Sequence, residues 1–159
     1  MPKIARTFIK TGLIYFLGAL LIALGFESKW FSFPGMMPLF WHLLMVGWIT
    51  QIIFGVSMWM FPGRKREEGF AAQKWAWLTY FLLNTGLVFR MIAEPVVATS
   101  SYAIWDIMVV LSAILQLVAA IAYFIELWPR IQSKEQRRRK RRKKRKKRDR
   151  NKVTNAKST

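Results

Sequence analysis

A few polar residues lie inside long apolar stretches, and they are the residues of this sequence that could do chemistry. His42 is the only histidine among 159 residues, and the chain has no cysteine. Haem iron takes one or two protein ligands, so a single imidazole suits it, whereas zinc normally needs three or four ligands. We interpret His42 either as an axial ligand of haem b or as an imidazole bonded to backbone or lipid. Met91 or a histidine from another subunit would supply the second axial ligand.

Arg90 is the second candidate, because a guanidinium inside an apolar stretch needs an anion or a route to lipid headgroups. Glu94 follows one helical turn later, and Asp106 is expected at a similar depth, so either carboxylate could pair with Arg90. Alternatively, the planar guanidinium would hold an anionic ligand group such as a haem propionate or a lipid phosphate.

The remaining polar residues within these stretches are expected to join helices rather than to react. Hydrogen bonds between membrane helices each contribute about 1 kcal/mol or less. The residues expected to make interhelical contacts are Gln51, Asn84, Asp106 and Gln116. The sequence offers no catalytic carboxylate pair, no nucleotide-binding loop and no nucleophile–base arrangement, so we do not expect an enzyme.

The elements that must position these residues are four apolar segments, at about 8–26, 38–61, 73–93 and 102–128. A membrane-spanning helix needs about 20 mostly apolar residues. The connections are short, so consecutive helices should pack antiparallel. We therefore predict an all-α integral membrane protein, an up-down-up-down four-helix bundle over residues 1–129. With 53% apolar residues concentrated in these segments, a soluble globular enzyme is excluded.

Basic residues set the expected orientation. They lie before or at the start of the first segment (Lys3, Arg6 and Lys10), between the second and third or at the start of the third (Arg64, Lys65, Arg66 and Lys74), and after the fourth. The other two connections hold only Lys29. Lys and Arg concentrate in the cytoplasmic loops of membrane proteins. We expect a multi-pass protein of the inner or cytoplasmic membrane with both termini in the cytoplasm.

Residues 130–159 form a strongly basic tail, with 17 of the 26 Lys and Arg residues of the chain. Like charges keep such a segment extended and disordered. Anionic lipid attracts it by about 1 kcal/mol per basic residue near the surface. An acidic partner surface or non-specific contact with ribosomal RNA are the alternatives, and other nucleic-acid binding is not expected. The unbroken basic run is Arg137, Arg138, Arg139, Lys140, Arg141, Arg142, Lys143, Lys144, Arg145, Lys146, Lys147 and Arg148.

The residues from Trp41 to Thr50 (WHLLMVGWIT), followed by Ile53-Phe54-Gly55, resemble an early helix of subunit I of the haem-copper oxidase and nitric-oxide reductase superfamily. Asn84-Thr85-Gly86-Leu87 with Arg90 is similar to the next helix of NnrS-like membrane proteins. The resemblance covers about residues 38–94 and implies that His42 ligates a low-spin haem. The superfamily's reducing centre needs further histidines, which this chain lacks. The resemblance therefore implies a truncated relative that holds one haem with a partner's help, or an accessory subunit.

Three functional hypotheses follow. The leading one is a small multi-pass accessory subunit of a larger membrane complex, respiratory or otherwise electron-transferring, whose partners are other membrane subunits. The second is a haem-b electron carrier that uses His42, with Met91 or a second His42 opposite and Arg90 on a propionate. The third is a membrane tether whose basic tail recruits anionic lipid or ribosomes.

Overall fold

The computed structural model describes residues 1–28, 34–61, 74–131 and 142. The described residues are helical and include no strand, which confirms the all-α prediction. The elements are α1 (Lys3–Glu27), α2 (Met36–Trp41), the π-helix η1 (His42–Thr50), α3 (Gln51–Met60), α4 (Lys74–Val97), α5 (Ala103–Leu127) and the 3₁₀-helix η3 (Trp128–Arg130).

Four helices are long and apolar enough to cross a membrane: α1, the continuous helix α2–η1–α3, α4 and α5. α1 begins before the predicted apolar segment, which starts at about residue 8, because the charged residues Lys3 and Arg6 form its first turns. The third ended too early, at residue 93. Proline loses one helical hydrogen bond and usually ends a helix, yet α4 includes Pro95 and continues for two residues beyond it.

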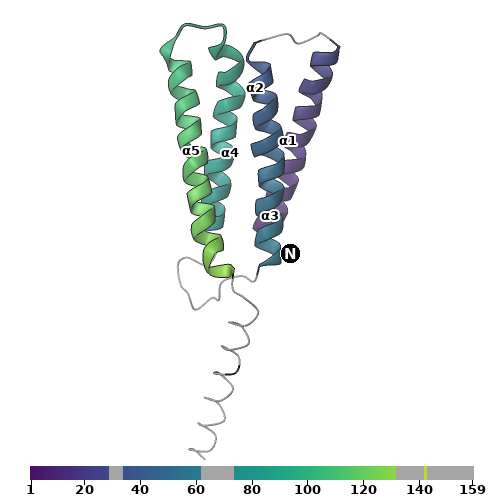
Figure 1. Cartoon of the computed structure of the whole chain (residues 1–159), viewed down its shortest axis with the longest axis vertical. Helices are drawn as coiled ribbons and strands as arrows, with labels where there is room; N and C mark the ends of the chain where they lie inside the picture. Colours follow the sequence, from purple (N-terminus) through teal and green to yellow (C-terminus); the bar gives the residue numbers. More distant parts are fainter. Residues whose placement is uncertain (29–33, 62–73, 132–141, 143–159) are drawn as a thin grey trace, which may run out of the picture.

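The long helices lie side by side (Figure 1). α1 and α4 begin, and α3 and α5 end, at the same end of the molecule, which we call the N-terminal end; the opposite end is the far end. α1 packs along η1 and α3, and α4 packs along α5. We call α1 with α2–η1–α3 the first pair and α4 with α5 the second pair.

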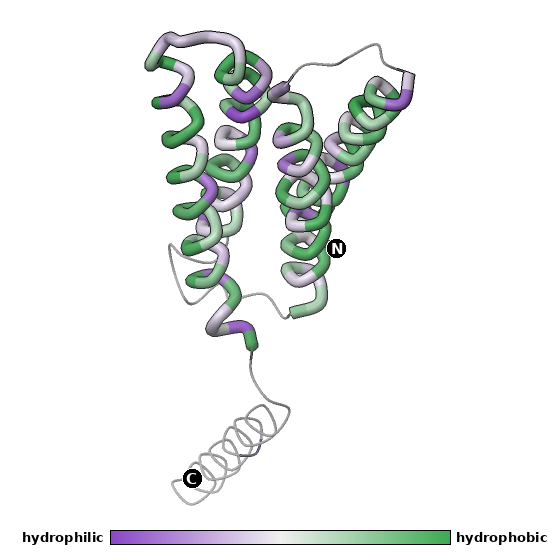
Figure 2. The backbone as a smooth tube through the Cα atoms, turned by 45° about the horizontal axis from the view of Figure 1, so that its top comes forward, coloured by the Kyte–Doolittle hydropathy of each residue, from purple (hydrophilic) through white to green (hydrophobic). Residues whose placement is uncertain are grey.

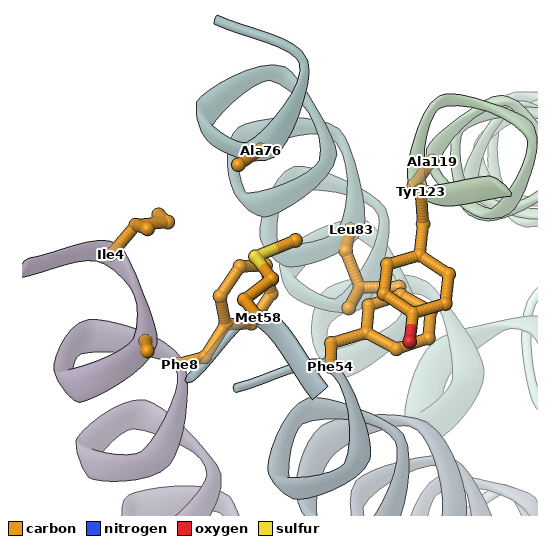
Figure 3. Packing of buried hydrophobic residues seen from close by; sticks show 9 residues of the cluster. Ile4, Phe8, Phe54, Met58, Ala76, Leu83, Ala119 and Tyr123 are labelled. Atoms are coloured by element: carbon orange, nitrogen blue, oxygen red, sulfur yellow. The ribbon is translucent and has the colours of Figure 1, made fainter. Parts of the chain in front are cut away.

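Near the N-terminal end, a single apolar cluster unites all four long helices (Figure 3). Phe8 of α1 meets Tyr80 of α4 edge-on, with ring centroids 5.1 Å apart. Phe54 of α3 stacks on Tyr123 of α5, with centroids 3.6 Å apart. The other core cluster contains Ala19, Leu39 and Leu43, all from the first pair. The two pairs therefore share an apolar core mainly toward the N-terminal end.

The middle of the second span is a π-helix, which the apolar pattern did not predict. Over His42–Thr50 the backbone is wound more loosely than in an α-helix, and the Thr50 hydroxyl donates to the carbonyl of Met45, five residues back, at 2.8 Å. π turns occur frequently at functional sites. His42 is the first residue of this one.

The long helices are apolar along most of their length (Figure 2), and each carries large apolar side chains that are exposed. Only 22% to 33% of the residues in the most apolar window of each span are buried within the chain. Leu17 and Leu21 on α1 and Leu117 on α5 are each more than 60% exposed. Large exposed apolar surfaces of this kind are typical of contacts with a membrane or with other proteins.

Candidate functional site at the contact of His42 and Glu94

Three helices supply the site near the far end. His42 lies where α2 passes into η1, Arg90 and Glu94 lie one turn apart on α4, and Ser112 lies on α5. The spacing of four residues brings Arg90 and Glu94 to one face of α4. That face is turned toward both η1 and α5, so the site joins the first pair to the second.

The imidazole of His42 is held at one of its two nitrogens. Nδ1 lies 2.9 Å from Oε1 of Glu94 and 2.9 Å from the carbonyl oxygen of Pro38. Both oxygens act as acceptors when Glu94 is ionised, so Nδ1 carries the hydrogen. Within the described residues Nε2 makes no hydrogen bond, and the side chain is 27% exposed. Nε2 is therefore the ring nitrogen of His42 that takes no part in the network.

Arg90 extends the network from α4 to α5. Its Nη1 donates to Oε1 of Glu94 at 2.9 Å, and its Nε donates to the hydroxyl of Ser112 at 3.1 Å. The Ser112 hydroxyl in turn donates to the carbonyl of Gly86 at 2.7 Å and accepts from Nε2 of Gln116 at 3.2 Å. The guanidinium is thus fixed by partners on both helices of the second pair.

Glu94 is the centre of this network and is only 4% exposed. Its Oε1 is shared by His42 and Arg90, whereas its Oε2 has no hydrogen-bond partner among the described residues. A buried carboxylate is costly unless cations and donors compensate it. Gly35 lies directly against this turn of α4, since a Cβ placed on it would come 1.9 Å from the carbonyl oxygen of Glu94.

The structure leaves two predicted candidates outside the network. Met91 is 43% exposed on α4, so its thioether is directed outward. Asp106 is exposed in the first turn of α5 and takes part in no hydrogen bond or ion pair with the described residues. Arg90 pairs with Glu94 rather than with Asp106.

A second polar group lies nearer the middle of the spans. Gln51 is fully buried and donates from Nε2 to Oδ1 of Asn84 at 3.0 Å, which ties α3 to α4. Asn84 donates to the carbonyl of Tyr80, whose hydroxyl is 2.9 Å from that of Thr11 on α1. The face of Gln51 with Gly47 and Gly55 packs against α1, as their close contacts with α1 side chains and backbone indicate.

Several contacts were not foreseen from the sequence. The sequence offers Glu94 as a partner of Arg90 but not of His42, because no local pattern predicts a contact between two different helices. Arg130 was assigned to the tail, yet it is 7% exposed and forms an ion pair with buried Glu126, four residues earlier. The spacing of four residues was the available signal. Of the basic run 137–148, the structure describes only Arg142, which is exposed; the other eleven lie outside the described residues.

Comparison of the chain with family models, curated proteins and solved structures finds no match. The site's chemistry is therefore argued from its own residues. The described residues contain no group of three or more His, Asp and Glu side chains that could hold a metal ion by themselves. A metal-bound histidine usually donates its other ring N–H to a carboxylate or carbonyl, and His42 has that arrangement.

Proposed function

We propose that this chain is a small accessory subunit of a larger membrane complex in the inner or cytoplasmic membrane. Its four spans would form an up-down-up-down bundle with both termini and the basic tail in the cytoplasm. The distribution of Lys and Arg supports this orientation, because the basic segments 3–10, 64–74 and 130–159 then share one side. The far end, with His42 and Glu94, would face the opposite side.

The observation that carries the accessory role is the contrast between the inside and the outside of the bundle. The polar side chains of the His42–Glu94 network contact one another and so join η1, α4 and α5. The outer faces of α1 and α5 are broad and apolar, with Ile14 and Leu21 each 67% exposed. Such surfaces suit packing against other membrane helices. An electron-transfer complex is the preferred setting because of the resemblance of residues 38–94 to oxidase and reductase subunits.

Native mass in mild detergent tests this proposal. The tagged protein, purified at its natural expression level, should migrate in a particle several times larger than the chain with its detergent belt. Substitution of outward residues, such as Leu17→Trp together with Leu21→Trp, should release it as a small particle that remains folded. A small particle for the unaltered protein under the mildest conditions would contradict the accessory role.

A second candidate, a haem-b electron carrier, is favoured by the orientation of His42. The carboxylate of Glu94 accepts a hydrogen bond from Nδ1–H, so Nε2 is the nitrogen that would bind the haem iron. Bound haem would supply one-electron redox chemistry. Among the described residues, His42 would supply one ligand to the haem iron. The predicted role of Arg90 at a propionate fits less well, because Glu94 and Ser112 already engage its Nη1 and Nε. The second ligand would come from His42 of another copy or from Met91.

A reduced-minus-oxidised visible spectrum separates the two candidates. A carrier should show a b-type spectrum that disappears in His42→Ala. The variant Met91→Leu identifies the second ligand. The b-type spectrum should persist if that ligand is His42 of another copy, and it should change if the ligand is Met91. A colourless protein made with ample haem supply would contradict the haem candidate.

A further inference from the structure

The first turns of α1 carry three basic side chains on one face. Lys3, Arg6 and Lys10 are all exposed. At about 100° per residue, they lie within about 60° of one another around the helix axis. Ala5 and Phe8, on the opposite face, are buried in the apolar cluster that unites the four helices. The three cations therefore lie on the face of α1 that is turned away from the bundle.

No acidic side chain in the described part of the chain compensates these cations. Lys3, Arg6 and Lys10 form no ion pair with the described residues. The first 26 residues contain neither Asp nor Glu. Of the acidic residues that the structure describes, Glu126 alone lies at the N-terminal end, and it is buried and paired with Arg130. This face of α1 therefore attracts an anion from outside the described part of the protein.

The position of Lys10 along α1 places its charge at the edge of a bilayer. α1 has no charged residue between Lys10 and Glu27. At a rise of about 1.5 Å per residue, the Cα atoms of these two residues lie about 25 Å apart, which is less than the roughly 30 Å of a hydrocarbon core. A lysine at such a depth extends its ammonium along the helix to the headgroup layer. The anion that it meets there is the phosphate of a phospholipid.

Apolar side chains continue the same face of α1 beyond the cations. Leu13 and Ile14 follow Lys10 by three and four residues, the spacing that places side chains on one helix face. They are 49% and 67% exposed, and Leu17, on the next turn, is 61% exposed. The face therefore carries cations at the level of the headgroups and an uncharged apolar surface at the level of the acyl chains. A phospholipid has its phosphate and its hydrocarbon chains in the same order.

We propose that this face of α1 binds an anionic phospholipid in the leaflet at the N-terminal end. The planar guanidinium of Arg6 binds the lipid phosphate through two parallel hydrogen bonds. The ammonium of Lys10 approaches the same phosphate from the hydrocarbon side, and Lys3 adds positive charge at the outer surface. The acyl chains lie along Leu13 and Ile14. Three cations favour a lipid with net negative charge over a zwitterionic one, whose phosphate is already neutralised by choline.

Quenching by brominated lipid measures this site, since the chain has no cysteine and accepts a single fluorophore at a chosen position. The full-length protein carries Gln at all twelve positions of the basic run 137–148, which removes the charge of that run from the measurement. One label is placed at Leu13→Cys on α1. The control label is placed at Leu117→Cys on α5, which is 62% exposed. Each position lies ten residues from the N-terminal end of the molecule's Lys3 or Leu127, where its helix begins or ends.

The two labels are compared in nanodiscs of phosphatidylcholine that contain brominated phosphatidylglycerol. At position 13, quenching should report that phosphatidylglycerol binds at least about fivefold more strongly than phosphatidylcholine, the factor that one basic residue near an anionic surface contributes. At position 117, quenching should follow the mole fraction of the brominated lipid. An equal preference at both positions, or no preference at position 13, would overturn the proposal.

Two double variants complete the test. Arg6→Gln/Lys10→Gln removes the two cations at the headgroup level and should abolish the preference at position 13. Arg6→Lys/Lys10→Arg conserves the charge and should keep the preference. Both residues are exposed, so the helical content of either variant should stay unchanged. A preference that persists in the Gln variant would overturn the proposal. The inference requires that α1 spans a bilayer but does not rest on the accessory role, because the purified chain in nanodiscs has no partner subunit.

Discussion

Gln51 and Asn84 are bonded to each other across the two helix pairs, with Nε2 of Gln51 donating to Oδ1 of Asn84 at 3.0 Å. Gln51 is fully buried, and its own Oε1 has no partner among the described residues. Nδ2 of Asn84 donates to the carbonyl oxygen of Tyr80. One hydrogen bond therefore satisfies what would otherwise be an entirely unpaired amide in the interior of the bundle.

Asn84→Leu should destabilise the bundle by about 1 kcal/mol, within the range measured for interhelical hydrogen bonds in membranes. The substitution leaves both ends of the Gln51 amide buried without a partner. Unfolding in mixed micelles with increasing denaturing detergent measures the change. Thr85→Ala, at an exposed position on the same helix, is the control and should change stability little. The double variant Gln51→Leu/Asn84→Leu should lose less than the sum of the single variants; simple additivity would contradict the coupling.

Gly35→Ala should push the helix pairs apart at the far end. The added Cβ would lie 1.9 Å from the carbonyl oxygen of Glu94 and 2.9 Å from Cα of Pro95, both backbone atoms that cannot rotate away. Overpacking of this kind costs about 1–3 kcal/mol. Thermal unfolding in detergent checks the loss of stability.

The matched control is Gly18→Ala on α1, where the nearest atom to an added Cβ is 3.8 Å away at the flexible tip of Leu43. Its effect should stay within about 0.5 kcal/mol. Equal effects of the two substitutions would show that the close approach of Gly35 to α4 does not matter for stability.

Tyr123→Phe isolates one hydroxyl at the junction of α3 and α5. The Ser57 hydroxyl donates to the carbonyl of Phe54, so in its 2.7 Å contact with the Tyr123 hydroxyl it accepts. Removing the donor should cost about 1 kcal/mol while the ring stack on Phe54 persists. Tyr123→Ala removes the stack as well and should cost about 3–5 kcal/mol. Similar unfolding midpoints for the two variants would contradict a separate contribution of the stack.

The sequence predicted four long apolar helices, which the structure confirms, because length and apolar content can be read directly from the residues. Apolar content does not mark the helix ends, since α1 includes the charged residues Lys3 and Arg6 and α4 continues past Pro95. The π-helix that begins at His42 has the same apolar composition as an α-helix, so the sequence does not predict it. The contact of His42 with Glu94 depends on how α2 and α4 pack, which a periodicity within one helix does not determine.

The basic run 137–148 predicts a second membrane contact that is independent of the spans. Protein in neutral nanodiscs should co-sediment with vesicles containing phosphatidylserine but not with vesicles of phosphatidylcholine alone, because each basic residue near an anionic surface contributes about 1 kcal/mol. Raising the ionic strength from about 0.1 M to about 1 M shortens the screening length from about 10 Å to about 3 Å and should release the vesicles.

Replacing the twelve basic residues with Gln keeps the length of the tail and removes its charge, so it separates electrostatics from mere chain length. This variant should lose vesicle binding while its helical content and unfolding midpoint stay unchanged. If it still binds anionic vesicles, the apolar surface of the spans and not the tail makes the contact. The unaltered protein could instead bind neither vesicle type but bind ribosomes in a salt-dependent manner. In that case the tail binds the phosphate groups of RNA through charge alone, without base recognition.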